Sequence, residues 1–72
     1  MVHLNDRLRE LRTSNGSLQK EVASYLGLSV LGYKRYEYGT RKPTSDTIIK
    51  LCEYFDVSAD YLLGLSDDPT RR

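Results

Sequence analysis

Apolar residues recur along the chain at helical spacing and are separated by short polar breaks. The first apolar stripe, spaced i, i+4 and i+7, consists of Leu4, Leu8 and Leu11. It predicts a helix that starts near Asn5 or Asp6. The pair Asn15-Gly16 ends this helix, because glycine readily adopts the left-handed conformation that follows many helices.

Four further helices follow from the same spacing, each preceded by a polar residue that can cap its N-terminus. The predicted caps of the second to fifth helices are, in chain order, Ser17, Ser29, Thr44 and Ser58. The second helix ends at Gly27, and the third runs over residues 29–38. We expect an all-α fold, a compact five-helix bundle.

The length limits how this bundle is organised. Seventy-two residues make one small domain, which we place at residues 1–65. Residues 66–72 are polar and include Pro69, so we expect a disordered C-terminal tail there. Such a tail could also be a linker to a further domain.

Several function classes lack the residues they need. One cysteine, Cys52, and one histidine, His3, cannot form an internal disulfide or a four-ligand zinc site. The sequence has no glycine-rich phosphate loop and no nucleophile–base pair, so we expect no enzyme and no cofactor. It has no apolar run of membrane-spanning length, and charge at Asp6 and Arg7 interrupts any secretory segment. We expect a cytoplasmic binding module.

Charge is unevenly distributed, although the whole chain carries only +1. Residues 1–43 hold eight basic and four acidic residues, whereas residues 44–72 hold three basic and six acidic ones. One basic end suits a domain that docks on phosphates by one face. Two solvated faces of unlike sign explain the charges equally well.

The second and third helices are joined by a connection of a few residues centred on Gly27. So short a joint makes the helices cross steeply, which is the helix-turn-helix geometry that presents one helix to a DNA major groove. Ala23, four residues before Gly27, suits the close approach of crossing helices. An ordinary helical hairpin is the alternative.

Longer stretches then identify a family. The segment from Gln19 to Ser29 (QKEVASYLGLS), followed by Tyr-Glu-x-Gly ending at Gly39 and by Pro43, resembles the phage-repressor and Cro-like helix-turn-helix (XRE) family. The resemblance continues through Thr44–Leu51 and Val57–Gly64 and so covers nearly the whole folded chain. It implies a helix-turn-helix at about residues 18–38.

The resemblance also implies roles for single residues. The base-reading positions of the recognition helix fall on Val30, Leu31, Lys34 and Arg35. The positions near the DNA backbone fall on Gln19, Ser29, Gly32, Tyr38, Thr40, Arg41 and Lys42. An ion pair between the first helix and the recognition helix falls on Arg12 and Glu37.

The chain departs from the family pattern at several of these positions. Leu18 stands where a polar residue usually precedes the glutamine, and Tyr33 stands at a buried position that is usually aliphatic. Gly32 costs its helix up to ~1 kcal/mol against alanine, which would be offset if a phosphate or sugar comes close. Val30 and Leu31 can only contact thymine methyl groups or exclude water, so we expect modest, T-rich readout, or a protein-binding patch with weak DNA affinity.

Together these observations predict a transcriptional regulator, a repressor, that binds double-stranded DNA at a near-palindromic operator as a homodimer. The residues proposed for the dimer surface are Tyr61, Leu62 and Leu65. The alternative is an antitoxin-like or antagonist module that uses the same helical face to bind a protein partner.

Overall fold

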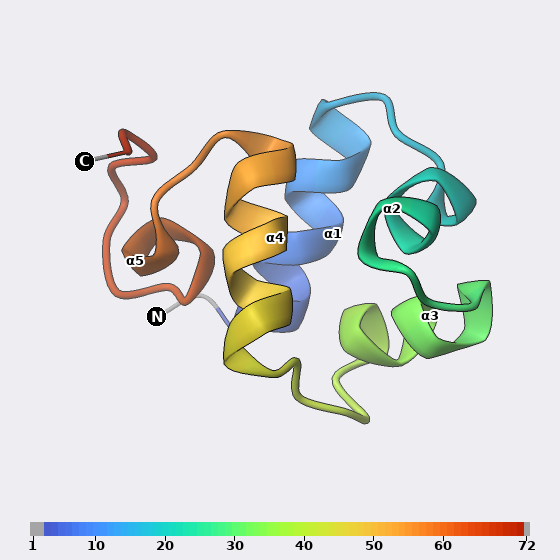
Figure 1. Ribbon diagram of the computed structural model, residues 1–72. Helices are drawn as coiled ribbons and strands as arrows, with labels where there is room; N and C mark the ends of the chain where they lie inside the picture. The colour runs from blue at the N-terminus through green and yellow to red at the C-terminus, as the bar shows by residue number, and fades with distance from the viewer. Residues whose placement is uncertain (1–2, 72) are drawn as a thin grey trace.

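The computed structural model describes residues 3–71, which form five helices and no strand (Figure 1). In chain order they are α1 (Leu4–Ser14), α2 (Gln19–Leu26), α3 (Val30–Tyr38), α4 (Ser45–Phe55) and α5 (Ala59–Leu62). In Figure 1, α2 and α3 lie to one side of α1 and α4, and α5 lies to the other. The predicted all-α, five-helix fold is confirmed.

The core draws on all five helices and is small. Its buried apolar residues are Leu8, Val22, Ala23, Leu26, Tyr33, Tyr36, Leu51, Cys52, Val57 and Leu62. Tyr33 is the largest of the fully buried side chains, so α3 contributes an aromatic ring to the core. None of the helices formed by residues 3–71 has the length and apolar character needed to cross a bilayer.

Three of the four predicted N-caps are confirmed. Ser29 Oγ accepts a hydrogen bond from the backbone N–H of Gly32, and Ser58 Oγ accepts one from the N–H of Tyr61, each at 3.1 Å. Thr44 Oγ1 accepts one from the N–H of Thr47 at 3.2 Å. Each cap satisfies a backbone donor that has no acceptor within its own helix.

The prediction that Ser17 caps α2 is wrong. Leu18 holds the N-cap position of α2, and its backbone N–H donates to Glu21 Oε1 at 2.7 Å. Ser17 is buried instead, where its Oγ accepts from Asn15 Nδ2 at 2.7 Å and shares a hydrogen bond with Tyr54 Oη at 3.0 Å. The hydroxyl therefore joins the α1–α2 turn to α4.

The segment after α5 returns along the α4–α5 connection. Ser58 N–H donates to the carbonyl of Pro69 at 3.0 Å, and Arg71 lies 3.5 Å from Asp56 Oδ1. Arg7 of α1 is buried, with its guanidinium 3.8 Å from the centre of the Tyr61 ring and 3.8 Å from Asp67 Oδ1. Residues 66–71 thus contact the domain where the sequence predicted a disordered tail; Arg72 lies outside the described residues.

Candidate nucleic-acid interface

The connection between α2 and α3 is short and centred on Gly27, as the sequence predicted. Gly27 ends α2 with a left-handed backbone (φ 72°), and the N–H of Leu28 reaches back to the carbonyl of Ala23 at 2.9 Å. Ser29 then caps α3 two residues after Gly27. Ala23 is buried, as a close helix crossing requires, and α2 packs against α3.

Helix α3 has a distinct inner and outer face. Tyr33, Tyr36 and Glu37 are buried against the rest of the domain. On the outer face Leu31 is 59% exposed, Val30 is 38% exposed and Arg35 is exposed, whereas Lys34 is partly buried. The four residues that the resemblance assigns to base reading thus project from α3, two of them as open apolar surface.

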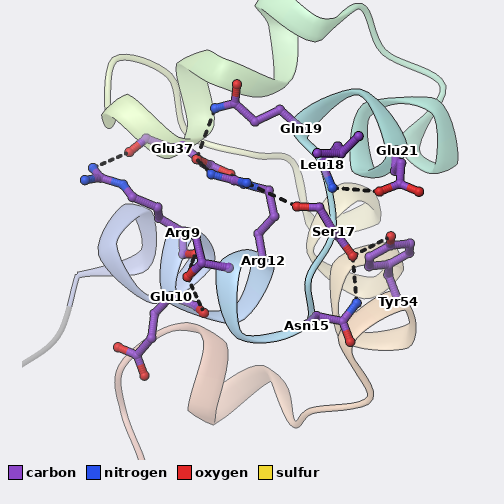
Figure 2. Close-up of polar contacts among 11 residues, drawn as sticks. Arg9, Glu10, Arg12, Asn15, Ser17, Leu18, Gln19, Glu21, Glu37 and Tyr54 are labelled. Atoms are coloured by element: carbon purple, nitrogen blue, oxygen red, sulfur yellow. Dashed lines mark hydrogen bonds and ion pairs between the residues drawn. The ribbon is translucent and has the colours of Figure 1, made fainter.

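An ion pair joins α1 to the inner face of α3 (Figure 2). Arg12 Nε donates to Glu37 Oε2 at 2.5 Å, and a second guanidinium nitrogen donates to Oε1 at 3.2 Å. The third nitrogen donates to the carbonyl of Ser17 at 3.1 Å. Because the contact to Glu37 is bidentate and the carboxylate is 1% exposed, this pair fixes the orientation of α3.

Gln19 lies at the first position of α2 and belongs to the same cluster. Its Nε2 donates to Glu37 Oε1 at 3.3 Å, so the carboxamide turns toward α3 (Figure 2). A carboxamide nitrogen carries two protons, which leaves one donor of Gln19 available. The first backbone N–H groups of α2 also lack acceptors within the helix.

Tyr33 lies beneath this cluster. Its hydroxyl is fully buried and has no hydrogen bond of acceptable geometry within residues 3–71, although it is close enough to Glu37 for each group to affect the other's pKa. Burial, reinforced by the Glu37 carboxylate, raises the pKa of the Tyr33 phenol. Tyr33 is therefore neutral and adds no charge beside Arg12 and Glu37.

Hydrogen bonding decides the charge of Glu37. Burial alone would raise the pKa of this carboxyl, but the hydrogen bonds from Arg12 and Gln19, together with the nearby Tyr33 hydroxyl, outweigh it and lower the pKa below its usual value of 4.5. The hydrogen bond to Glu37 likewise raises the pKa of Arg12. Both groups are charged at neutral pH.

These shifts predict an acid-sensitive contribution to stability. A carboxyl whose pKa is lowered by folding stabilises the folded state above its unfolded pKa and loses that contribution as the pH falls through its folded pKa. The difference in unfolding free energy between wild type and Glu37→Gln should therefore be constant near neutral pH and shrink below pH 4.5. Urea unfolding of both proteins between neutral pH and pH ~2 measures it. A difference that does not change with pH would show that folding does not lower the pKa of Glu37.

The loop after α3 folds back onto the end of that helix. The carbonyl of Arg35 accepts from the backbone N–H groups of Thr40 at 3.0 Å and Arg41 at 3.3 Å, and from Thr40 Oγ1 at 3.3 Å. These bonds hold the start of the loop, so the exposed side chains of Arg41 and Lys42 project from an anchored backbone. Tyr38, at the end of α3, is 60% exposed.

Gly32 has a local role that the sequence did not reveal. Its N–H donates to the cap Ser29, and a Cβ added at Gly32 would lie 3.2 Å from Ser29 Oγ, which is a tight contact. The capping geometry therefore accounts for a small residue at Gly32 without a nearby phosphate. Close approach of DNA there stays a prediction.

Arg9 was not among the predicted site residues. It donates to the carbonyl of Glu37 at 3.5 Å, and its side chain is otherwise exposed (Figure 2). Asn5, Arg9 and Arg12 are spaced i, i+4 and i+7, so they share one face of α1, and Arg9 and Arg12 contact α3 from it. This polar stripe could have identified Arg9 as a site residue from the sequence.

Known proteins share both the sequence and the fold. A family model described as helix-turn-helix matches residues 8–62. The chain is 40% identical over 63 residues to the uncharacterized HTH-type transcriptional regulator YobD of Bacillus subtilis. It is 31% identical over 63 residues to the cryptic phage CTXphi transcriptional repressor RstR of Vibrio cholerae. Each match covers 88% of this chain and 56% of the relative, so the chain spans little more than half of their length.

A solved structure shows the same architecture. The P22 c2 repressor protein, crystallised in complex with a synthetic operator, superimposes with a TM-score of 0.81 at 22% identity. The match covers 88% of this chain and 96% of that one. The fold is therefore shared with this repressor, and the family model over residues 8–62 shows that the chain belongs to the helix-turn-helix family, of the phage-repressor and Cro-like type that its motif resembles.

Proposed function

We propose that this chain is the operator-binding domain of a repressor, which inserts α3 into the major groove of a near-palindromic site and acts as a homodimer. The observation that carries the proposal is the hydrogen bond from Gln19 to Glu37. It places the N-terminus of α2 beside α3, while the bonds to the Arg35 carbonyl place the basic loop at the end of the same helix. Phosphate-binding and base-reading groups thereby adjoin one another.

The side chains proposed to read bases from α3 are of two chemical kinds, cationic and aliphatic. Arg35 can bind the O6 and N7 atoms of a guanine with two parallel hydrogen bonds, and Lys34 can reach a base or a phosphate. Val30 and Leu31 can contact thymine methyl groups or exclude water. We infer readout of one or two polar positions beside a T-rich step.

The backbone contacts come from residues on either side of α3. The helix dipole and free N–H groups at the start of α2 favour a phosphate next to Gln19. Arg41 and Lys42 supply cations from the loop, and Tyr38 supplies a hydroxyl donor at the end of α3. The remaining backbone positions that we propose on the family pattern are Ser29, Gly32 and Thr40.

The proposed dimer surface needs one correction. Leu62 is fully buried in the core and cannot contact a second copy, and Tyr61 is partly buried against Arg7. Leu65 is 66% exposed and Leu63 is also exposed, so the apolar surface available after α5 consists of these two leucines. We propose that a second copy covers Leu65, with half-sites about one helical turn apart.

The strength of binding as a function of salt tests the proposed function. Each cation–phosphate contact contributes a slope of about −0.9 to the logarithm of affinity against the logarithm of salt concentration. We expect steep salt dependence on duplex DNA, because the loop that carries Arg41 and Lys42 and the start of α2 both adjoin α3. Titration of a labelled duplex by fluorescence anisotropy at several salt concentrations measures the slope. A protein-binding role for exposed Val30 and Leu31 predicts no duplex binding even at low salt.

A further inference from the structure

The start of α2 is held by side chains from three other helices. Arg12 of α1 donates to the carbonyl of Ser17, immediately before α2. The Ser17 hydroxyl shares a hydrogen bond with Tyr54 of α4. Gln19 donates to Glu37 of α3. Only the last of these three bonds links α2 directly to the recognition helix.

We propose that Glu37 is a positioning residue for DNA binding: it holds the Gln19 carboxamide, at the start of α2, in a fixed position relative to α3. The proposal rests on the proposed function, because it concerns how that interface is assembled. Glu37 is 1% exposed and directs both oxygens to donors, so it contacts no DNA itself. It acts through Gln19.

Two features give this bond a role beyond packing. Glu37 Oε1 receives both Arg12 and Gln19, so one carboxylate oxygen sets the position of a guanidinium and of an amide. Because the Gln19 amide donates one of its two protons to Glu37, the second proton points in a fixed direction and is not free to rotate. A donor already fixed in direction loses less conformational entropy when it meets a phosphate.

Charge balance supports the same role. Glu37 is an anion close to the proposed path of the phosphates, and a solitary carboxylate there would repel DNA. The bidentate contact from Arg12 neutralises it. The carboxylate can therefore orient Gln19 without opposing the approach of the DNA backbone.

A double-mutant cycle on duplex affinity tests the coupling. Gln19→Met keeps the side-chain size and removes its hydrogen bonds, and we expect affinity to fall about five- to tenfold. Glu37→Gln should lower the affinity of the wild type by a similar factor. In the Gln19→Met background it should change affinity less than about twofold, because the group that Glu37 positions is then absent. All four proteins are compared at a temperature at which their melting curves show complete folding.

Lys42→Ala provides the control cycle. Lys42 is exposed in the loop, and within residues 3–71 no hydrogen bond or ion pair joins it to Glu37. The factors by which Lys42→Ala and Glu37→Gln lower affinity should therefore simply multiply in the double mutant. If the losses of affinity caused by Gln19→Met and Glu37→Gln also multiply in the double mutant, the proposal is overturned. A wild type that binds no duplex at low salt would overturn it together with the proposed function.

A second measurement needs no DNA, so it tests the positioning role of Glu37 separately from the proposed function. Gln19 is the only glutamine in the sequence, so its side-chain amide gives a single identifiable pair of proton signals in an NMR spectrum. We expect one of these protons to be shifted and slow to exchange in the free wild-type protein, and to lose both properties as Glu37 is protonated by acid. The other titratable groups that face Glu37 are Arg12, Tyr33 and Arg9, the last of which donates to the Glu37 carbonyl. The pKa values of Arg12 and Tyr33 are both raised, so neither changes charge in acid, and an arginine guanidinium is not deprotonated in proteins. Signals of a freely hydrated amide at neutral pH would overturn the proposal, whatever the DNA affinity.

Discussion

Replacing Glu37 with glutamine should lower the free energy of unfolding by about 3 kcal/mol, the low end of what removing one partner of a buried ion pair costs. The substitution keeps the size of the side chain but leaves Arg12 as an enclosed cation without an anion, since Arg12 is only 16% exposed. It also disturbs the acceptor shared with Gln19. A loss of this size is a large share of the stability of a small domain.

Glu53→Gln provides the matched control for this prediction. Glu53 lies on α4, is exposed, and forms no ion pair within residues 3–71. We expect its replacement to change stability by less than about 0.5 kcal/mol. Thermal and urea unfolding at neutral pH compare the two variants. Equal stability of both would remove the ion pair as a determinant of how α3 is oriented.

Replacing Arg35 with alanine should cost about 1–3 kcal/mol of binding on the preferred duplex and flatten the preference at one base pair. The guanidinium is exposed, and the backbone beneath it is anchored through the Arg35 carbonyl. Its loss should therefore remove a base contact without altering the fold. Affinities for the preferred duplex and for its single-base variants measure the effect.

Lys42→Ala should behave differently from Arg35→Ala. A residue that meets phosphates weakens binding to all sequences alike and reduces the salt slope by about one unit. A uniform loss across sequences for both variants would show that Arg35 does not read a base. The two proteins should have the same melting temperature as the wild type, because both side chains project from the surface.

Local signals explain why most of the fold was predictable. The caps Ser29, Thr44 and Ser58 each bond to a backbone N–H three residues ahead, so sequence spacing alone identifies them. The positive φ values of Gly27 and Gly39 likewise follow from residue type. Helical periodicity then locates the apolar faces, and five short amphipathic helices leave few ways to form one core.

The errors arose where a distant partner decides the outcome. Ser17 is bonded to Tyr54, 37 residues away, and this contact overrides its tendency to cap α2. Leu62 was assigned to the surface because periodicity does not reveal which face of a short helix turns inward. The burial of Arg7, which no sequence pattern predicted, depends in the same way on a distant contact, because its guanidinium lies over the Tyr61 ring of the last helix.

The site shows the same division between local and distant information. The exposure of Val30, Leu31 and Arg35 follows from the position of α3 in the helix-turn-helix. The hydrogen bond between Gln19 and Glu37 spans 18 residues and depends on how α2 packs against α3. No pairwise pattern in the sequence specifies it, so the coupling became visible only in three dimensions.

Selection from a random-sequence duplex library tests the central claim most directly. The purified protein is incubated with the library at two salt concentrations, and the retained duplexes are sequenced. We predict enrichment of a near-palindrome with half-sites about one helical turn apart, and a steep loss of retention at the higher salt concentration. Failure to retain any duplex at low salt, or retention without enrichment, would contradict an operator-binding regulator.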